Sequence, residues 1–124
     1  MSQFNYPGNA TGASLLPPAS YANTAAVAAA ATSVDLLDYE GPVLITQHHG
    51  AGTGTLDGKI QDSADNTSFA DVSGLTFTQS TTGADIKTLV VQSKQVRRYI
   101  KYVGTIGTGP QIAGVSMSGV KKSV

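Results

Sequence analysis

The sequence contains no cysteine and no tryptophan, and only 8 Lys or Arg and 8 Asp or Glu occur among its 124 residues. The absence of cysteine excludes disulfides, thiol catalysis, iron–sulfur clusters and thiolate zinc sites. A formal net charge of zero argues against direct nucleic-acid binding through overall positive charge. The longest apolar run, residues 25–31, is far shorter than the roughly 20 residues that cross a bilayer. No basic segment precedes an apolar stretch as in a signal peptide, so we expect no membrane partner and synthesis in the cytoplasm.

Asp, Glu, Lys and Arg are also missing from the first 34 residues, and the first side chain charged at neutral pH is that of Asp35. This leading segment holds three prolines, many small polar residues and few large apolar side chains. A helix over 25–31 is possible by propensity but marginal alone in water. We therefore expect residues 1–33 to form an extended arm, either a flexible tail or a strap laid on a partner. The anchor residues of such a strap would be Phe4, Tyr6, Leu15, Leu16 and Tyr21.

From residue 34 onward, stretches rich in Val, Ile, Thr, Tyr and Phe alternate with clusters of Gly, Asn, Asp and Ser. This texture is typical of β-strands joined by turns. Because a parallel sheet would need crossover helices, we predict that residues 34–124 form an all-β domain, an antiparallel β-sandwich with a jelly roll as the favoured topology. Strands are expected at 34–39, 43–49, 55–62, 68–72, 75–80, 86–92, 96–106 and 111–118.

Alternation within these strands predicts which side chains are buried. Leu75 and Phe77 share one face of their strand, and Leu56 and Ile60 share one face of theirs. The stretch 96–106 has no cleanly apolar face, which suits a strand with one face on the core and the other on a partner.

Residues that could carry chemistry are few. His48 and His49 are neighbours in a predicted strand and point to opposite faces, so we expect structural or solvent-exposed roles rather than a shared metal. Asp65 and Asn66 are better explained by a turn than by calcium, because the local spacing does not follow an EF-hand loop; adventitious calcium binding is the alternative. With no Gly-x-Ser-x-Gly elbow, we predict no catalytic residue, no cofactor and no metal, and a protein that is not an enzyme.

Charge is unevenly distributed along the chain. Residues 35–71 hold seven acids and one lysine, whereas residues 85–124 hold one acid and seven bases. We expect an electrically two-faced domain suited to self-association or to docking on a charged protein lattice. Within the basic region, Arg97, Tyr99 and Lys101 fall on one face of a predicted strand and form a second candidate partner interface.

Two pieces of sequence resemble the small head decoration, or cement, proteins of tailed bacteriophages. The first is the run 55–74, with KIQDSADN at its centre and FADV after it, and the second is VRRYIKYV at 96–103. The resemblance spans roughly residues 34–118 and includes no catalytic motif. It implies a β-sandwich on the outside of the phage head that bridges neighbouring major capsid proteins, commonly as a homo-dimer or homo-trimer, and stabilises the shell.

The resemblance thus predicts a structural virion protein whose partners are the major capsid protein and further copies of itself. Two alternatives remain open at this point. One is a carbohydrate-binding β-sandwich on the virion surface, and the other is a minor head–tail component.

Overall fold

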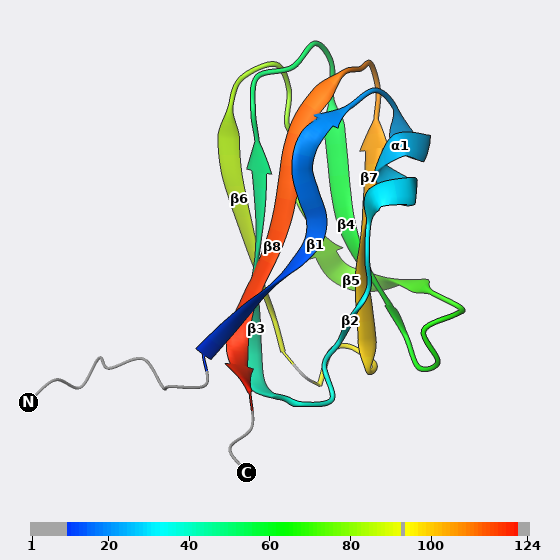
Figure 1. Cartoon of the computed structure of the whole chain (residues 1–124), viewed down its shortest axis with the longest axis vertical. Helices are drawn as coiled ribbons and strands as arrows, with labels where there is room; N and C mark the ends of the chain where they lie inside the picture. Colours follow the sequence, from blue (N-terminus) through cyan, green and yellow to red (C-terminus); the bar gives the residue numbers. More distant parts are fainter. Residues whose placement is uncertain (1–9, 93, 122–124) are drawn as a thin grey trace, which may run out of the picture.

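A computed structural model describes residues 10–92 and 94–121 of the chain as two four-stranded antiparallel sheets packed face to face (Figure 1). The elements in chain order are β1 (Ala10–Tyr21), α1 (Thr24–Ala30), β2 (Val34–Asp35), β3 (Tyr39–His49), β4 (Leu56–Ser63), β5 (Ala70–Thr76), β6 (Asp85–Val91), β7 (Tyr99–Ile106) and β8 (Gln111–Lys121). Sheet A has the strand order β1-β8-β3-β6, and sheet B has the order β2-β7-β4-β5. The predicted antiparallel β-sandwich is confirmed.

The strand pairs are nested along the chain. The first strand pairs with the last, β2 pairs with β7, β3 with β6, and β4 with β5. Further pairs, β3 with β8 and β4 with β7, join these into the two sheets. Such nesting is compatible with the jelly roll that the sequence favoured.

The core lies between the sheets and follows the predicted alternation. Leu56 and Ile60 are fully buried, and Leu75 and Phe77 are buried beside them. The other buried apolar side chains are Leu15, Leu16, Tyr21, Val27, Val43, Ile45, Val91, Ile100, Tyr102, Ala113, Val115 and Met117. Burial of a large apolar side chain contributes about 1.5–3 kcal/mol, so this cluster is the main source of stability.

Three polar side chains, those of Tyr102, Gln47 and Ser80, form a chain of hydrogen bonds in the core. In the part of the chain that the structure describes, every buried side-chain nitrogen or oxygen atom has a hydrogen-bond partner. The Tyr102 hydroxyl donates to Gln47 Oε1 at 2.6 Å, and Gln47 Nε2 donates to Ser80 Oγ at 3.4 Å. Burial raises the pKa of the Tyr102 hydroxyl. Gly58 packs against this pair, and a Cβ at that position would overlap both the Gln47 amide and the Tyr102 ring.

The structure corrects the predicted arm over the part that it describes. Residues 10–21 form an edge strand of sheet A, and Leu15, Leu16 and Tyr21 are core residues at most 5% exposed. The alternation of buried and exposed side chains typical of a strand is interrupted in β1, which is why the sequence pattern did not reveal it. Register shifts occur between Ser14 and Leu16 and between Leu16 and Ala19, a stretch that includes Pro17 and Pro18. Proline is tolerated there because β1 is an edge strand, whose outer side needs no donor. The remaining predicted anchors, Phe4 and Tyr6, lie outside the described residues.

The short helix α1 closes one side of the sandwich between β1 and β7 (Figure 1). Asn23 caps it by accepting from Ala26 N at 2.9 Å, and the buried Val27 attaches it to the core. Thr24 Oγ1 accepts from Ile106 N at 2.9 Å, which satisfies a donor on β7. Seven helical residues are marginal alone, so tertiary packing stabilises this helix.

Strand boundaries differ from the predicted ones at both edges of sheet B. The expected strands 68–72 and 75–80 are replaced by one strand, β5, which ends at Thr76 and has Gly74 at φ +83° inside it. The expected strand 34–39 is reduced to the two residues of β2, because a turn begins at residue 37.

Candidate binding surface

The outer side of sheet B carries charged side chains on all four of its strands. On β4 the outward side chains are Asp57, Lys59 and Gln61, and on β7 they are Tyr99, Lys101 and Val103. These two strands are neighbours, with Gln61 opposite Lys101 and Lys59 opposite Val103. We call this surface, together with Asp71 of β5, the turn between β4 and β5, and the ion pairs of Asp62 with Arg97 and of Asp35 with Arg98, the charged face.

The turn between β4 and β5 projects from the edge of sheet B (Figure 1). Asp65 organises it, because its Oδ1 accepts from Thr67 N at 2.9 Å, Ser68 N at 3.0 Å and Ser63 Oγ at 2.8 Å. The backbone N–H groups of Ser68 and Thr67 and the Ser63 hydroxyl lower the pKa of Asp65 to about 2. Asn66 follows in the left-handed region at φ 62°. The predicted turn role of Asp65 and Asn66 is confirmed.

Arg97 and Asp62 form the most extensively bonded ion pair of the charged face. Arg97 Nη2 donates to Asp62 Oδ1 at 2.8 Å and to the Asp62 backbone oxygen at 3.0 Å, and Arg97 N donates to Oδ2 at 2.9 Å. Asp62 is 7% exposed. Burial alone would raise the pKa of Asp62, but the hydrogen bonds and charge of Arg97 outweigh burial and lower it.

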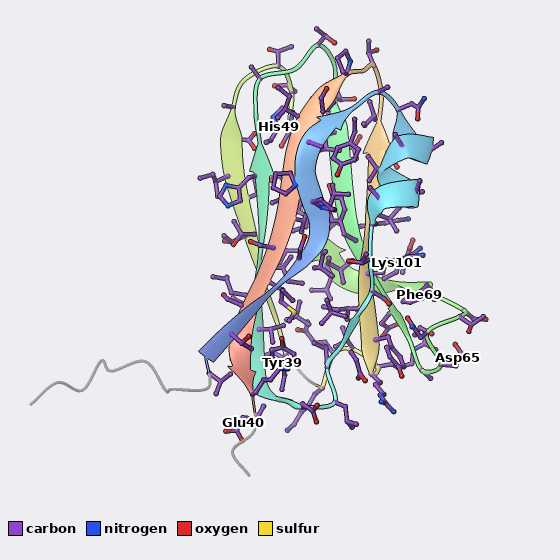
Figure 2. The ribbon with its side chains drawn as sticks, in the orientation of Figure 1. Tyr39, Glu40, His49, Asp65, Phe69 and Lys101 are labelled. Atoms are coloured by element: carbon purple, nitrogen blue, oxygen red, sulfur yellow. The ribbon has the colours of Figure 1, made fainter. Side chains whose placement is uncertain are left out.

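Two further cations of this region contact aromatic rings. Lys101 Nζ lies 4.5 Å from the centre of the Phe69 ring, and Arg98 Cζ lies 5.0 Å from that of Tyr99. Figure 2 shows Lys101 and Phe69 side by side, with Asp65 further out in the turn. Arg98 also donates to both carboxylate oxygens of Asp35, at 2.9 and 2.8 Å. The side chains are therefore held in place before any partner binds.

The predicted interface residues Arg97, Tyr99 and Lys101 all lie in this region. Tyr99 and Lys101 are outward neighbours on β7, while Arg97 precedes the strand and its guanidinium group is bound to Asp62. Phe69 was not predicted, although it lies in the FADV piece that carries the resemblance. Its contact with Lys101 could not be predicted from local pattern, because 32 residues separate the two.

The prediction of one acidic and one basic face is wrong. Four acids are in contact with bases: Asp35 with Arg98, Asp62 with Arg97, Asp71 with Lys59, and Asp85 with Lys87. Two of these pairs, Asp35 with Arg98 and Asp62 with Arg97, join an acid of the acid-rich segment to a base of the base-rich segment. The antiparallel pairing of sheet B therefore brings opposite charges together.

Sheet A presents the contrasting outer side, which we call the uncharged face. Between Leu44 and His48 of β3 and at their partner positions on β6 and β8, the described outward side chains include no Asp, Glu, Lys or Arg: Leu44, Thr46 and His48 on β3, Ile86, Thr88 and Val90 on β6, and Ser116 and Ser118 on β8, with Ile112 further along β8. His48 is exposed, whereas its neighbour His49 points inward and is 3% exposed. The opposite orientations predicted for the two histidines are confirmed.

His49 is held by hydrogen bonds at the end of the core. Its Nδ1 lies 3.0 Å from the Gly83 carbonyl oxygen and its Nε2 lies 2.5 Å from Gln111 Oε1. Gln111 Nε2 in turn donates to the Thr108 carbonyl at 3.0 Å. His49 therefore links three loops at this end of the sandwich.

Residues 10–92 and 94–121 contain no group of three or more His, Asp or Glu side chains arranged to hold a metal ion. The same residues include no helix with the length and apolar character needed to cross a membrane. Comparison with protein-family models and with curated proteins finds no match for this chain.

Proposed function

We propose that this chain is a structural virion protein that binds the outer surface of a phage capsid, bridges major capsid proteins and stabilises the head. One observation carries the proposal. The two pieces of sequence that resemble decoration proteins, KIQDSADN with FADV and RYIKYV, are more than 20 residues apart in the chain but adjoin in the fold. They form β4, the β4–β5 turn, the start of β5 and β7, which together make the charged face.

The charged face suits a contact with a protein lattice. Its strands are backed by the core, and the pairs Arg97–Asp62 and Lys101–Phe69 fix its long side chains. Preordered side chains lose less conformational entropy on binding, so even a modest contact gains affinity. A copy that bridges two shell subunits binds more tightly than one that contacts a single subunit, because its second contact forms at a high effective concentration. Many such copies on a repeating shell would stabilise the shell as a whole.

The role proposed for each residue follows from its position. Tyr99 and Lys101 supply an aromatic ring and a cation at the middle of the face, and Phe69 supplies a second ring beside them. Aromatic residues and arginine are enriched at protein interfaces. This role needs no turnover, cofactor or metal, and it places the protein on the outside of the head after synthesis in the host cytoplasm.

The test is co-sedimentation of the purified full chain with expanded shells of the encoding phage that lack it. We expect saturation at a stoichiometry set by the two-fold or three-fold positions of the lattice. Binding of only a few copies per shell would instead indicate a minor head–tail component. Absence of binding, with a signal on a glycan array, would replace the proposal with carbohydrate recognition.

Variants locate the binding surface. Lys101→Glu reverses a charge beside Phe69, and we expect it to weaken shell binding at least about tenfold. Lys121→Glu reverses a charge at the end of β8 in the other sheet and serves as the matched control. Equal binding by both variants would show that the charged face does not contact the shell.

A further inference from the structure

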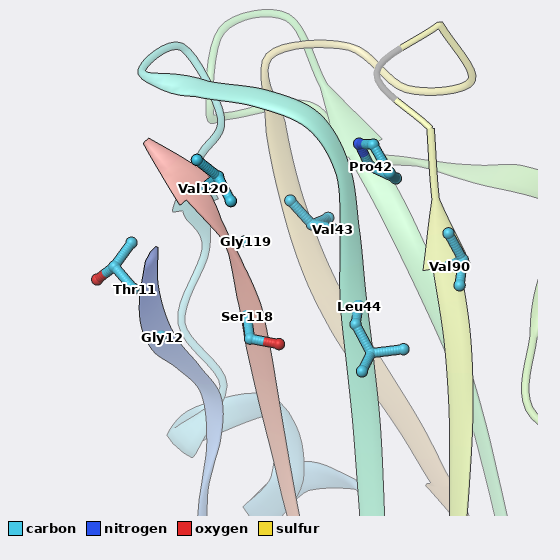
Figure 3. A pocket seen from close by; sticks show the side chains of 9 residues that line it. All are labelled: Thr11, Gly12, Pro42, Val43, Leu44, Val90, Ser118, Gly119 and Val120. Carbon is cyan, nitrogen blue, oxygen red and sulfur yellow. The ribbon is translucent and has the colours of Figure 1, made fainter. Parts of the chain in front are cut away.

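The uncharged face has a shape that complements itself. Its β3 and β6 half carries a ridge of aliphatic side chains, with Leu44 40%, Ile86 64% and Val90 54% exposed. Its β1 and β8 half carries Gly12, Ser14, Ser116 and Ser118, which line a shallow groove. At one end the groove extends between Ser118 and Leu44 (Figure 3).

Cross-strand register places ridge and groove in the same rows. Leu44 is the partner of Ser118 on one side and of Val90 on the other, and Ser118 is the partner of Gly12. From β1 to β6, the row therefore consists of two small residues, Gly12 and Ser118, followed by two large ones, Leu44 and Val90. A second copy turned about a two-fold axis along the strands, between β8 and β3, would set Leu44 over Ser118 and Val90 over Gly12.

The next row consists of hydroxyl side chains. Ser14, Ser116, Thr46 and Thr88 are partners across β1, β8, β3 and β6. The same two-fold axis would place Ser116 opposite Thr46 of the other copy and Ser14 opposite Thr88. A hydroxyl both donates and accepts, so a band of hydroxyls can pair with a copy of itself.

The edges of the sandwich are protected against pairing, which leaves the face as the route to association. Edge strand β6 carries Asp85 and Lys87, which pair with each other at 2.7 Å. Edge strand β1 has two register shifts and a Pro-Pro pair, and edge strand β2 has only two residues. The fourth edge strand, β5, has a register shift in its pairing with β4. Charges, bulges, prolines and short strands are the devices that prevent edge-to-edge pairing.

The area of the face fits a dimer. Four strands about 4.8 Å apart and roughly 30–36 Å long give about 600–700 Å² per copy, or about 1,200–1,400 Å² for a pair. Specific interfaces begin at about 1,200 Å² in total. Two copies that meet through these rows bring no like charges together. The nearest carboxylate along β3 is that of Glu40, and a register shift separates it from Leu44.

We propose that the uncharged face of sheet A is a homodimer interface, in which the Leu44 and Val90 ridge of each copy seats on the β1 and β8 groove of the other. The two charged faces then point away from each other. The inference does not depend on capsid binding, because it concerns the purified chain alone.

The experiment measures the mass of the full chain by sedimentation equilibrium across a range of concentrations. We expect a dimer with a Kd on the order of 1–100 μM, as befits an interface near the lower end of the standard size. Ser116→Arg places a charge at the centre of the face and should raise this Kd about 100-fold or more, because two copies then oppose like charges. Thr105→Arg adds the same charge on the outer side of β7 and should leave the Kd unchanged.

A second variant guards against loss of folding. Leu44→Ser removes part of the ridge at an exposed position and should raise the dimer Kd about tenfold, with thermal unfolding by circular dichroism confirming a folded sandwich. A wild-type chain that stays monomeric up to about 1 mM would overturn the proposal. So would a dimer that survives Ser116→Arg. Loss of shell binding by Ser116→Arg in a monomeric protein would assign the face to the capsid instead.

Discussion

The two outer faces of the sandwich differ in how they use charge. The charged face of sheet B contains ion pairs between residues far apart in the sequence, such as Asp35 with Arg98, whereas the uncharged face of sheet A has only aliphatic, hydroxyl, glycine and histidine side chains. Paired charges keep a surface hydrated and fix its side chains, while exposed aliphatic side chains favour removal from water. The same core therefore supports one face built for solvent and polar contacts and one built for burial.

Acid should have the largest effect, because it neutralises the carboxylates of the charged face together. Asp35, Asp62, Asp65 and Asp71 all have a lowered pKa in the folded state, that of Asp65 falling from 3.8 to about 2. The folded state therefore binds fewer protons than the unfolded state, so this stabilisation is complete above about pH 5 and is lost progressively as the pH falls toward 2. Urea unfolding between about pH 6 and pH 2 measures this decline.

Asp65→Asn provides the control for the acid experiment. Asparagine keeps an oxygen that accepts from the turn N–H groups but has no carboxyl group to titrate, so part of the pH dependence should disappear. A urea midpoint that is the same at every pH would contradict the proposed contribution of these carboxylates.

Removal of Asp62 should have the next largest effect. Asp62→Ala leaves the backbone N–H and guanidinium of Arg97 without their acceptors, and we expect a loss of about 2 kcal/mol in the free energy of unfolding. Asp71→Ala breaks an exposed pair with Lys59 and should lower the free energy of unfolding much less than Asp62→Ala. Similar losses for the two variants would show that burial of Asp62 is unimportant.

A smaller effect is expected from the contact between Lys101 and Phe69. Lys101→Met keeps the apolar stem and removes the cation, so it should lower the free energy of unfolding by about 0.5–1 kcal/mol. The same substitution in a Phe69→Leu background should have little further effect. An equal loss in both backgrounds would rule out the ring as the partner of the cation.

The smallest effect is expected from the exposed pair of Asp35 and Arg98. Asp35→Asn keeps an acceptor for Leu37 N but removes the charge, and the loss should be about 0.5 kcal/mol or less. About 1 M salt should abolish the difference from wild type by screening. A loss that persists at high salt would indicate hydrogen bonding rather than charge as its source.

Local alternation predicted much of the fold, because period-two patterns such as Leu56 with Ile60 reflect one buried side of a strand. It failed for β1, where two register shifts break the period and Pro17 and Pro18 imitate a linker. The absence of charge before Asp35 has a different cause from the one predicted. Residues 10–30 of this segment form an edge strand and a helix packed on the core, so Leu15, Leu16 and Tyr21 are buried rather than offered to a partner.

The candidate surface could be predicted only in part. Strand periodicity placed Tyr99 and Lys101 on one side of β7, but the ion pairs depend on register between strands that are distant in the sequence. The uncharged face was missed for a similar reason. Gly12, Ser118, Leu44 and Val90 come from four strands, and their common row exists only after the sheet has formed.

Pairing of β1 with β8 brings Ala10 and Val120 together as register partners, so the first and last strands leave the sandwich side by side. A short linker between them would allow a circular permutant, opened at the Asp65 turn, in which β8 and β1 become one local hairpin. Because the strand pairs are nested, the same cut makes β4 and β5 the most distant pair, so the permutant reverses the order of nesting while keeping the same sheets. Its new ends would emerge beside the charged face, where a fused peptide would be displayed.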